Sequence, residues 1–330
     1  MSRTRTGGSG TTRTARSSSR KGAELADGAE LARLEAAPRR TQLDADLAEA
    51  RWVRDQTSVP VQPRPYPRLP KRERPKPGLK ILVVGDAHAK PDTSNARFDW
   101  LGRLIVDRQP DAVVSIGDWT DFPSLGDYDR GKRCFEGRRY WKDLHASWDA
   151  RARVMAQLDS YNAGSRRPYR PKFYETLGNH EHRAWRVIDL EPRFEGTIDP
   201  HGDLRLKEFG WQLVPFLDVI ELGGVAFSHY FPKNGRAPAY TTKHLAANTL
   251  AHTHRSSVFG HAHRLDYFEE PRGEGRIQCV NAGCYFEHWE EWAGQQNRSW
   301  SRGLLELTDV REGQFGYQWL PMREIRSLYG

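Results

Sequence analysis

The chain has few cysteines and no long apolar run. Its cysteines, Cys134, Cys279 and Cys284, are an odd number without a Cys-x-x-Cys pair among 330 residues, which argues against a disulfide-stapled secreted scaffold and favours a reducing compartment. No apolar stretch approaches the roughly 20 residues that cross a bilayer, and we find no apolar signal-peptide core. We therefore expect no membrane contact and a cytoplasmic location.

Excess positive charge is absent from most of the chain. The net charge is +8, but residues 1–80 hold 18 of the 51 basic residues and nine of the 43 acidic ones. The rest of the chain is therefore close to neutral, and the overall charge does not indicate a basic binding face there.

The N-terminal region divides into three segments by composition. Residues 1–21 hold six basic residues and no acidic one, which favours a disordered basic tail because little apolar surface can be buried. Their Arg, Ser and Thr content is also typical of a transit peptide, and their charge would suit attachment to nucleic acid. Leucines at helical spacing predict a helical segment over 22–55, and seven prolines predict a linker over 56–78. Residues 79–330 then form the main domain.

Five strand-like runs end in polar side chains of similar kind. The first run, residues 81–84, leads into Asp86 and His88, and four later runs repeat this pattern. Sheet-based folds place their chemistry at the carboxyl ends of strands, so we expect these side chains to gather at one site. Carboxylate, amide and imidazole groups are ligands of divalent metal ions. The strand-end residues are Asp86, His88, Asp118, Asp121, Asn179, His180, His229, His261 and His263.

Each motif taken alone has an ordinary structural explanation. A Gly-Asp such as that of Asp118 is often a turn or a helix cap, and a strand-end His such as His229 is often a hydrogen-bonded core residue. The agreement of five motifs favours a metal site. His182, His252 and His254 lack this support, and we expect them around the site or at the surface.

The spacing of apolar residues between these motifs predicts an α/β fold. A helical pattern between residues 98 and 105 separates the first two runs and indicates a βαβ unit with parallel strands. A charged insertion follows at 122–145. We further expect helices over 146–162 and 239–254, a helical and irregular region over 184–210, strands over 211–220, 224–228, 276–282, 304–310 and 315–320, and a hairpin turn at 311–314.

The five motifs together resemble the calcineurin-like metallophosphoesterase superfamily. In chain order they are Asp-x-His, Gly-Asp-x-x-Asp, Gly-Asn-His-Glu, a strand-end His and Gly-His-x-His, and they span residues 85–263. The run 128–140, with the third motif, further resembles phage-encoded members. The resemblance implies two facing mixed β-sheets flanked by helices, a four-layer αββα sandwich, and a bacterial or phage-infected host cell.

The resemblance also implies a pair of divalent metal ions. Two cations about 3.5–4 Å apart would neutralise phosphoryl oxygens and acidify a bound water. Imidazole and oxygen donors without thiolate suit Mn, Fe, Zn or Ni, and we expect Mn first. The implied ligands are Asp86, His88 and His263 for the first ion, Asn179, His229 and His261 for the second, and Asp118 as the bridge.

The implied reaction is hydrolysis of a phosphate ester by a hydroxide held between the two ions. His180 would protonate the leaving group as general acid, and Asp121 would orient it. Arg183, Arg138 and Arg139 are candidate phosphate contacts.

Three aromatic residues are candidates for stacking on a base of the substrate. They are Trp119, Tyr128 and Tyr140, in or near the insertion.

We expect a phosphodiesterase or nuclease acting on nucleic acid or nucleotides. Three alternative functions are consistent with the sequence: a phosphomonoesterase, a non-catalytic scaffold of the same fold, and a nucleic-acid-binding protein that acts through residues 1–21. Protein Ser/Thr phosphatases carry Arg-Gly and Arg where this chain has Phe122, Pro123 and Leu177, which argues against that activity. The expected partners are a phosphate ester and nucleic acid, and the oligomeric state stays open.

Overall fold

The computed structural model describes residues 78–233, 235 and 243–330. The expected tail, the helical segment and all but the last residue of the linker lie outside these residues. Among the described helices, none is both long and apolar enough to cross a membrane.

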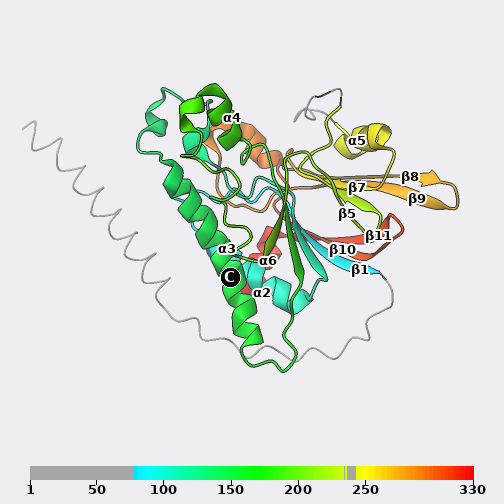
Figure 1. Ribbon diagram of the computed structural model, residues 1–330. Helices are drawn as coiled ribbons and strands as arrows, with labels where there is room; N and C mark the ends of the chain where they lie inside the picture. Colours follow the sequence, from blue (N-terminus) through cyan, green and yellow to red (C-terminus); the bar gives the residue numbers. More distant parts are fainter. Residues whose placement is uncertain (1–77, 234, 236–242) are drawn as a thin grey trace, which may run out of the picture. The chain divides into compact units, whose positions relative to one another are not determined.

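A six-stranded sheet carries the first three motifs (Figure 1). Its strand order is β11-β10-β1-β2-β3-β4. The strands β1 to β4 pair in parallel. On the other side of β1, β10 pairs antiparallel with β1, and β11 pairs antiparallel with β10. The bounds are β1 Leu79–Val84, β2 Ala112–Ser115, β3 Lys172–Thr176, β4 Trp211–Val214, β10 Gly303–Arg311 and β11 Gln314–Pro321.

A five-stranded sheet carries the last two motifs. Its order is β5-β6-β7-β9-β8, with β6, β7 and β9 in parallel and an antiparallel hairpin at each edge. The bounds are β5 Ile220–Leu222, β6 Val225–Phe227, β7 Ser257–Phe259, β8 Leu265–Arg272 and β9 Gly275–Ala282.

The two sheets face each other across one apolar core. Ile81 and Val83 of β1 are buried there with Phe227 of β6 and Val258 of β7. Because side chains alternate along a strand, the neighbouring residues of β1 point to the opposite face of the sheet, and they are buried as well. A strand buried on both faces reads as a continuous apolar run, which explains residues 81–84.

Helices cover the outer face of each sheet, which gives the expected four layers (Figure 1). The helices α2, α3 and α6 lie beside the six-stranded sheet, and α5 packs on β8 and β9. The bounds are α2 Ala96–Arg108, α3 Tyr140–Asn162, α4 Arg183–Leu190, α5 Leu245–Thr253 and α6 Met322–Tyr329, with 3-10 turns at Pro123–Leu125, Arg133–Phe135, Pro192–Phe194 and Glu291–Ser299.

Several expected element bounds were wrong. The helix expected from residue 146 begins at Tyr140, inside the supposed insertion. The strand expected over 211–220 is two strands in different sheets, because the chain turns at Pro215 and crosses from β4 to β5. The irregular region at 184–210 holds one short helix and turns, and the helix within 239–254 is α5. The strands at 276–282, 304–310 and 315–320 and the hairpin between β10 and β11 are confirmed.

A buried ion pair joins α3 to β3. Arg151 Nη2 donates to both carboxylate oxygens of Glu175, at 2.7 and 2.8 Å, and Arg151 Nη1 donates to Ser147 Oγ at 2.5 Å. Neither side chain of the ion pair is exposed to solvent. Burial raises the pKa of Glu175, and Arg151 offsets only part of this. Each charge therefore depends on the other, since an unpaired buried charge is strongly unfavourable.

We predict that Arg151→Met lowers the free energy of unfolding by about 3–5 kcal/mol, because Glu175 keeps its burial and loses its partner. Urea denaturation followed by circular dichroism measures this value. Arg186→Met is the control, because its ion pair with Asp127 is about half exposed and such pairs contribute about 0–1 kcal/mol. Equal losses for the two variants would contradict the prediction.

Candidate metal centre

The nine strand-end side chains gather at one place, where strands of both sheets end. The parallel strands of each sheet deliver their carboxyl ends to a common edge, so residues far apart in the chain become neighbours. The contributions are Asp86 and His88 after β1, Asp118 and Asp121 after β2, Asn179 and His180 after β3, His229 after β6, and His261 and His263 after β7.

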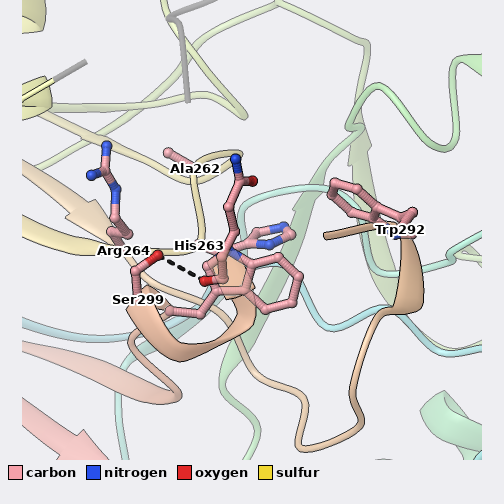
Figure 2. A pocket seen from close by; sticks show the side chains of 7 residues that line it. Ala262, His263, Arg264, Trp292 and Ser299 are labelled. Atoms are coloured by element: carbon pink, nitrogen blue, oxygen red, sulfur yellow. Dashed lines mark hydrogen bonds between the residues drawn. The ribbon is translucent and has the colours of Figure 1, made fainter. Parts of the chain in front are cut away.

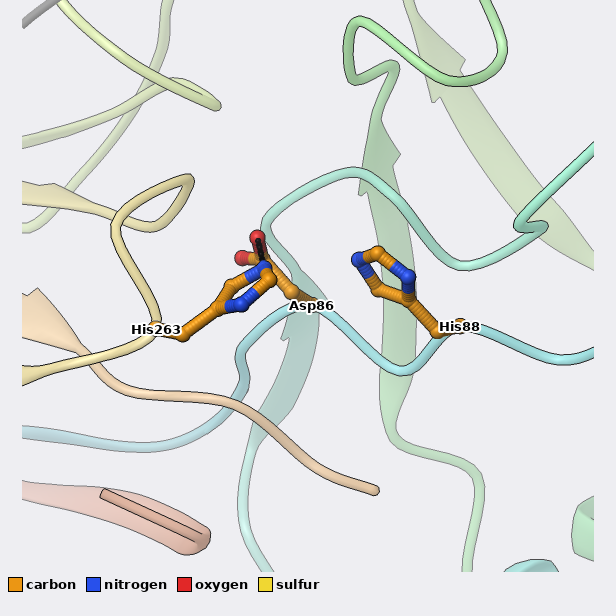
Figure 3. A group of neighbouring side chains, drawn as sticks. All are labelled: Asp86, His88 and His263. Atoms are coloured by element: carbon orange, nitrogen blue, oxygen red, sulfur yellow. Dashed lines mark ion pairs between the residues drawn. The ribbon is translucent and has the colours of Figure 1, made fainter. Parts of the chain in front are cut away.

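The first group of donor atoms belongs to Asp86, His88 and His263, whose ligand atoms lie within 4.8 Å of one another (Figure 3). His263 Nε2 lies 2.9 Å from Asp86 Oδ2. His88 Nε2 is buried and has no hydrogen-bond partner among the described residues. A buried polar atom without a partner is costly, so this donor set fits a metal ion.

The second group consists of Asp118, His229 and His261, again within 4.8 Å. His229 Nδ1 lies 2.7 Å from the carbonyl oxygen of Ile116. A carbonyl only accepts hydrogen bonds, so Nδ1 carries a proton and Nε2 is the nitrogen available as a metal ligand.

His229 Nε2 faces other possible ligand atoms. Asn179 Oδ1 lies 2.9 Å from Nε2, His261 Nδ1 lies 3.2 Å away, and Asp118 Oδ2 lies 3.4 Å away. Burial is the largest of the effects that lower the pKa of His261 to about 3, so His261 is neutral. Oxygen and imidazole atoms that converge in this way form the donor set of a divalent ion, so this group fits a second metal ion.

Asp118 lies between the two groups. Its Oδ2 is 3.4 Å from His229 Nε2 and 3.9 Å from His88 Nε2, and its Oδ1 accepts the His180 N–H at 2.9 Å. Burial opposes ionisation of Asp118, but the surrounding histidines outweigh it and lower its pKa. An ionised carboxylate in contact with both groups has the chemistry of a bridging ligand.

The backbone at several of these residues is strained. His88, Asp118, His261 and His263 have φ of 45°, 50°, 69° and 56°, in the left-handed region that costs a residue with a Cβ about 1–2 kcal/mol. Such strain persists only where the surrounding structure enforces it, and it is concentrated at functional sites.

Asp121 holds two of the histidines in place. Its Oδ1 lies 3.0 Å from His88 Nδ1 and 2.8 Å from His180 Nδ1. His180 Nδ1 is also 2.8 Å from the Asp121 backbone oxygen, so its proton lies on Nδ1. Burial opposes the charge of Asp121, but hydrogen bonds to His180 and His88 hold its pKa well below the usual range.

Arg183 contacts the other nitrogen of His180. Arg183 Nη2 lies 3.0 Å from His180 Nε2, and Nη1 donates to the carbonyl oxygens of Asp121 at 2.7 Å and Phe122 at 3.2 Å. Burial lowers the pKa of His180, and the Arg183 charge adds to this effect. In this state His180 is therefore a neutral imidazole with an unprotonated Nε2.

Sequence reasoning missed the role of Glu181, the last residue of the third motif. Its Oε2 accepts the N–H groups of Asp118 at 2.9 Å and Gly178 at 2.8 Å, and its Oε1 accepts that of Thr120 at 2.7 Å. Burial, with help from Asp118, raises the pKa of Glu181 to about 8. Glu181 thus ties the loop after β2 to the loop after β3. The position of Glu181 in the third motif was the sequence feature that could have predicted this role.

Arg97 of α2 stabilises the backbone next to the candidate metal ligands, and it belongs to none of the five sequence motifs. Its buried guanidinium donates to the backbone oxygens of Ala87 at 2.8 Å and Tyr285 at 3.2 Å. These bonds fix the turn between Asp86 and His88.

A cavity of about 580 Å³ opens beside the centre, and we call it the insertion cavity. Its lining includes Asn179 and His180 and two of the three arginines expected to contact phosphate, Arg183 and Arg138, whereas Arg139 is exposed and is not part of the lining. The Arg138 guanidinium donates to Asp129 at 2.9 Å. The cavity also contains charges of both signs: Lys90, Asp92, Asp121, Asp129, Glu136, Lys142, Asp143 and Glu290.

The aromatic residues expected to stack on a base differ in availability. Trp119 is fully buried against Phe98, so its candidate role was wrong. Tyr140 stacks on Phe122, and its hydroxyl donates to Asp203 at 2.9 Å. Tyr128 is 69% exposed and lines the insertion cavity.

Comparisons with known proteins found one matching family model and several similar solved structures. A family model described as calcineurin-like phosphoesterase matches residues 79–301. Nuclease MPE of Pseudomonas putida is 18% identical, with a TM-score of 0.31, over 64% of this chain and 78% of that chain. Yfce, a phosphoesterase from E. coli, is 13% identical, with a TM-score of 0.31, over 73% of this chain and 100% of that chain. No curated protein matches the chain in sequence.

We predict that Gly178→Ala weakens metal binding about 10–100-fold, the range seen when groups that orient ligands are changed. A Cβ at this position would lie 2.0 Å from Asp118 Oδ1 and would displace the carboxylate. Calorimetric titration with Mn²⁺ measures the affinity. Gly164→Ala is the control, because a Cβ there meets no atom within 4 Å. Unchanged affinity in a folded Gly178→Ala protein would count against the placement of Asp118.

Proposed function

The chain belongs to the calcineurin-like phosphoesterase family, and on this basis we propose that it is a phosphodiesterase acting on nucleic acid or nucleotides. Membership makes it a metal-dependent hydrolase of phosphate esters. The substrate class, the metal ligands and the general acid named below are our proposal. The observation that carries it is the convergence of carboxylate and imidazole atoms on both sides of Asp118.

We assign the ligands from this convergence. Asp118 would bridge two ions, Mn²⁺ being our first choice because the donors are oxygen and imidazole. Bound there, the two ions supply positive charge to the phosphoryl oxygens and acidify a water molecule. The remaining ligands are Asp86, His88 and His263 for one ion, and Asn179, His229 and His261 for the other.

His180 acts as the general acid in this proposal. Asp121 keeps the ring oriented through Nδ1 and favours the protonated form, and Nε2 points toward the centre, 3.8 Å from Asp118 Oδ2. In the described state Nε2 accepts a bond from Arg183. A phosphoryl oxygen would replace Nε2 as the acceptor of Arg183, which frees Nε2 to carry the proton that the leaving alkoxide needs.

The space around the centre favours a diester over a monoester. The insertion cavity reaches Asn179 and His180, and a second cavity reaches His263. A phosphate bound between them therefore has room for an organic group on each side. Residues 79–330 are the catalytic domain in this proposal, and the charge of residues 1–21 adds attraction to a nucleic acid.

We predict that His180→Ala lowers kcat by about 10²–10⁴ while the bound metal is retained, because the variant loses proton transfer and no ligand. Steady-state kinetics and metal analysis of the same sample measure both values. His182→Ala is the control, since this neighbour stacks on Phe216 with ring centroids 4.5 Å apart and should leave kcat unchanged. Loss of metal in His180→Ala would overturn the assignment.

We also predict that the Mn²⁺-loaded protein hydrolyses bis(p-nitrophenyl) phosphate with a higher kcat/KM than p-nitrophenyl phosphate, because the diester fills both cavities. Both esters release the same phenolate, so one absorbance assay compares them. Preference for the monoester would show that the protein is a phosphomonoesterase instead.

A further inference from the structure

A second cavity of about 230 Å³ borders the centre on the side of His263, and we call it the tryptophan cavity. In the view of Figure 2, Arg264 and Trp292 lie on either side of His263. Pockets for drug-sized ligands occupy roughly 300–1,000 Å³, so this cavity suits a single ring system. It is lined by Ala262, His263, Arg264, Trp292, Gln296, Ser299 and Trp300.

Two tryptophans give this cavity an aromatic wall. The ring of Trp300 lies edge-on to the ring of His263, with centroids 4.7 Å apart at 84°. The ring of Trp292 lies 6.0 Å from that of Trp300 at 48°. Trp300 thus packs against His263 of the candidate metal centre. Trp292 is 46% exposed and offers ring surface to a ligand.

The loop that carries Trp292 is braced by side-chain hydrogen bonds. Asn297 is fully buried, and its side chain bonds to the backbone of Glu290 at 2.9 and 2.7 Å and of Gly294 at 2.9 Å. An exposed aromatic ring on a fixed loop loses little conformational entropy when a ligand stacks on it. This arrangement is typical of a binding surface rather than of incidental exposure.

Trp292 also lies at the junction of the two cavities, because it lines both of them. A group stacked on Trp292 is therefore close to a phosphate held among the candidate metal ligands. Arg264 and Gln296 add hydrogen-bonding groups to the same wall, which suits the polar edge of a heteroaromatic ring better than a plain hydrocarbon.

We propose that the tryptophan cavity is a nucleobase subsite, in which Trp292 stacks on the base of the nucleoside attached to one side of the scissile phosphate. The insertion cavity then takes the group on the other side. This proposal rests on the phosphodiesterase function proposed above, and it narrows the substrate class to diesters that contain a nucleoside. Stacking tolerates every base, so the subsite selects for a base without selecting its identity.

The test compares two diesters with the same leaving group, thymidine 5′-(p-nitrophenyl phosphate) and methyl p-nitrophenyl phosphate. In the full-length Mn²⁺-loaded protein, Trp292→Ala should lower kcat/KM for the thymidine ester roughly 5- to 150-fold, the range expected for losing one stacked base. The methyl ester should be hydrolysed as by the wild type. Trp292→Phe should restore most of the activity on the thymidine ester, because it keeps an aromatic face.

Trp289→Ala is the matched control, because Trp289 is 51% exposed on the same stretch of chain and is not among the residues that line either cavity. It should leave both rates unchanged. An equal loss on both esters, or no loss on either, in a folded Trp292→Ala protein overturns the subsite and leaves the phosphodiesterase proposal standing. Failure of the wild type to hydrolyse either ester overturns the phosphodiesterase proposal, and the subsite with it.

Discussion

Dense packing of buried metal-ligand atoms is the constraint on which this site depends. Asn179 Oδ1 and His261 Nδ1 lie 2.9 and 3.2 Å from His229 Nε2, and Asp118 Oδ2 lies 3.4 Å from the same atom. His229 Nδ1 faces the carbonyl oxygen of Ile116, so Nε2 is the nitrogen directed at this group. Such a donor set fits divalent cations, and their charge is also what a phosphate ester requires for hydrolysis.

The rest of the fold holds these atoms in place. Strands of two sheets place the donors, and the shared apolar core between the sheets holds those strands together. Left-handed residues at the strand ends turn the side chains inward. Glu181 and Arg97 then secure the loops through backbone bonds. The stability of the sandwich thus compensates for the strain of the site, a common arrangement where a site must be rigid.

The sequence predicted the parts that short-range pattern determines. The apolar run at 81–84 followed by Asp86 and His88 indicated a buried strand and its polar end, because both are local features. The two-sheet arrangement followed from the family resemblance. The edge strand β8 and the short helix α6 were missed, since β8 is largely exposed and has no clean apolar alternation, and α6 buries only Met322 and Ile325.

Long-range partners explain the other misses. Nothing near Arg183 in the sequence shows that its guanidinium reaches His180 Nε2 and two backbone carbonyls. Trp119 was a candidate for stacking on a base, but α2 covers it with Phe98. Trp292 was overlooked because it lies outside every motif, and only the folded chain brings it beside His263.

Anomalous diffraction from crystals grown with Mn²⁺ tests the central claim most directly. The account predicts two anomalous peaks roughly 3.5–4 Å apart, with Asp118 bound to both, one beside His263 and the other beside His229. A single peak, or two peaks without Asp118 between them, would contradict it.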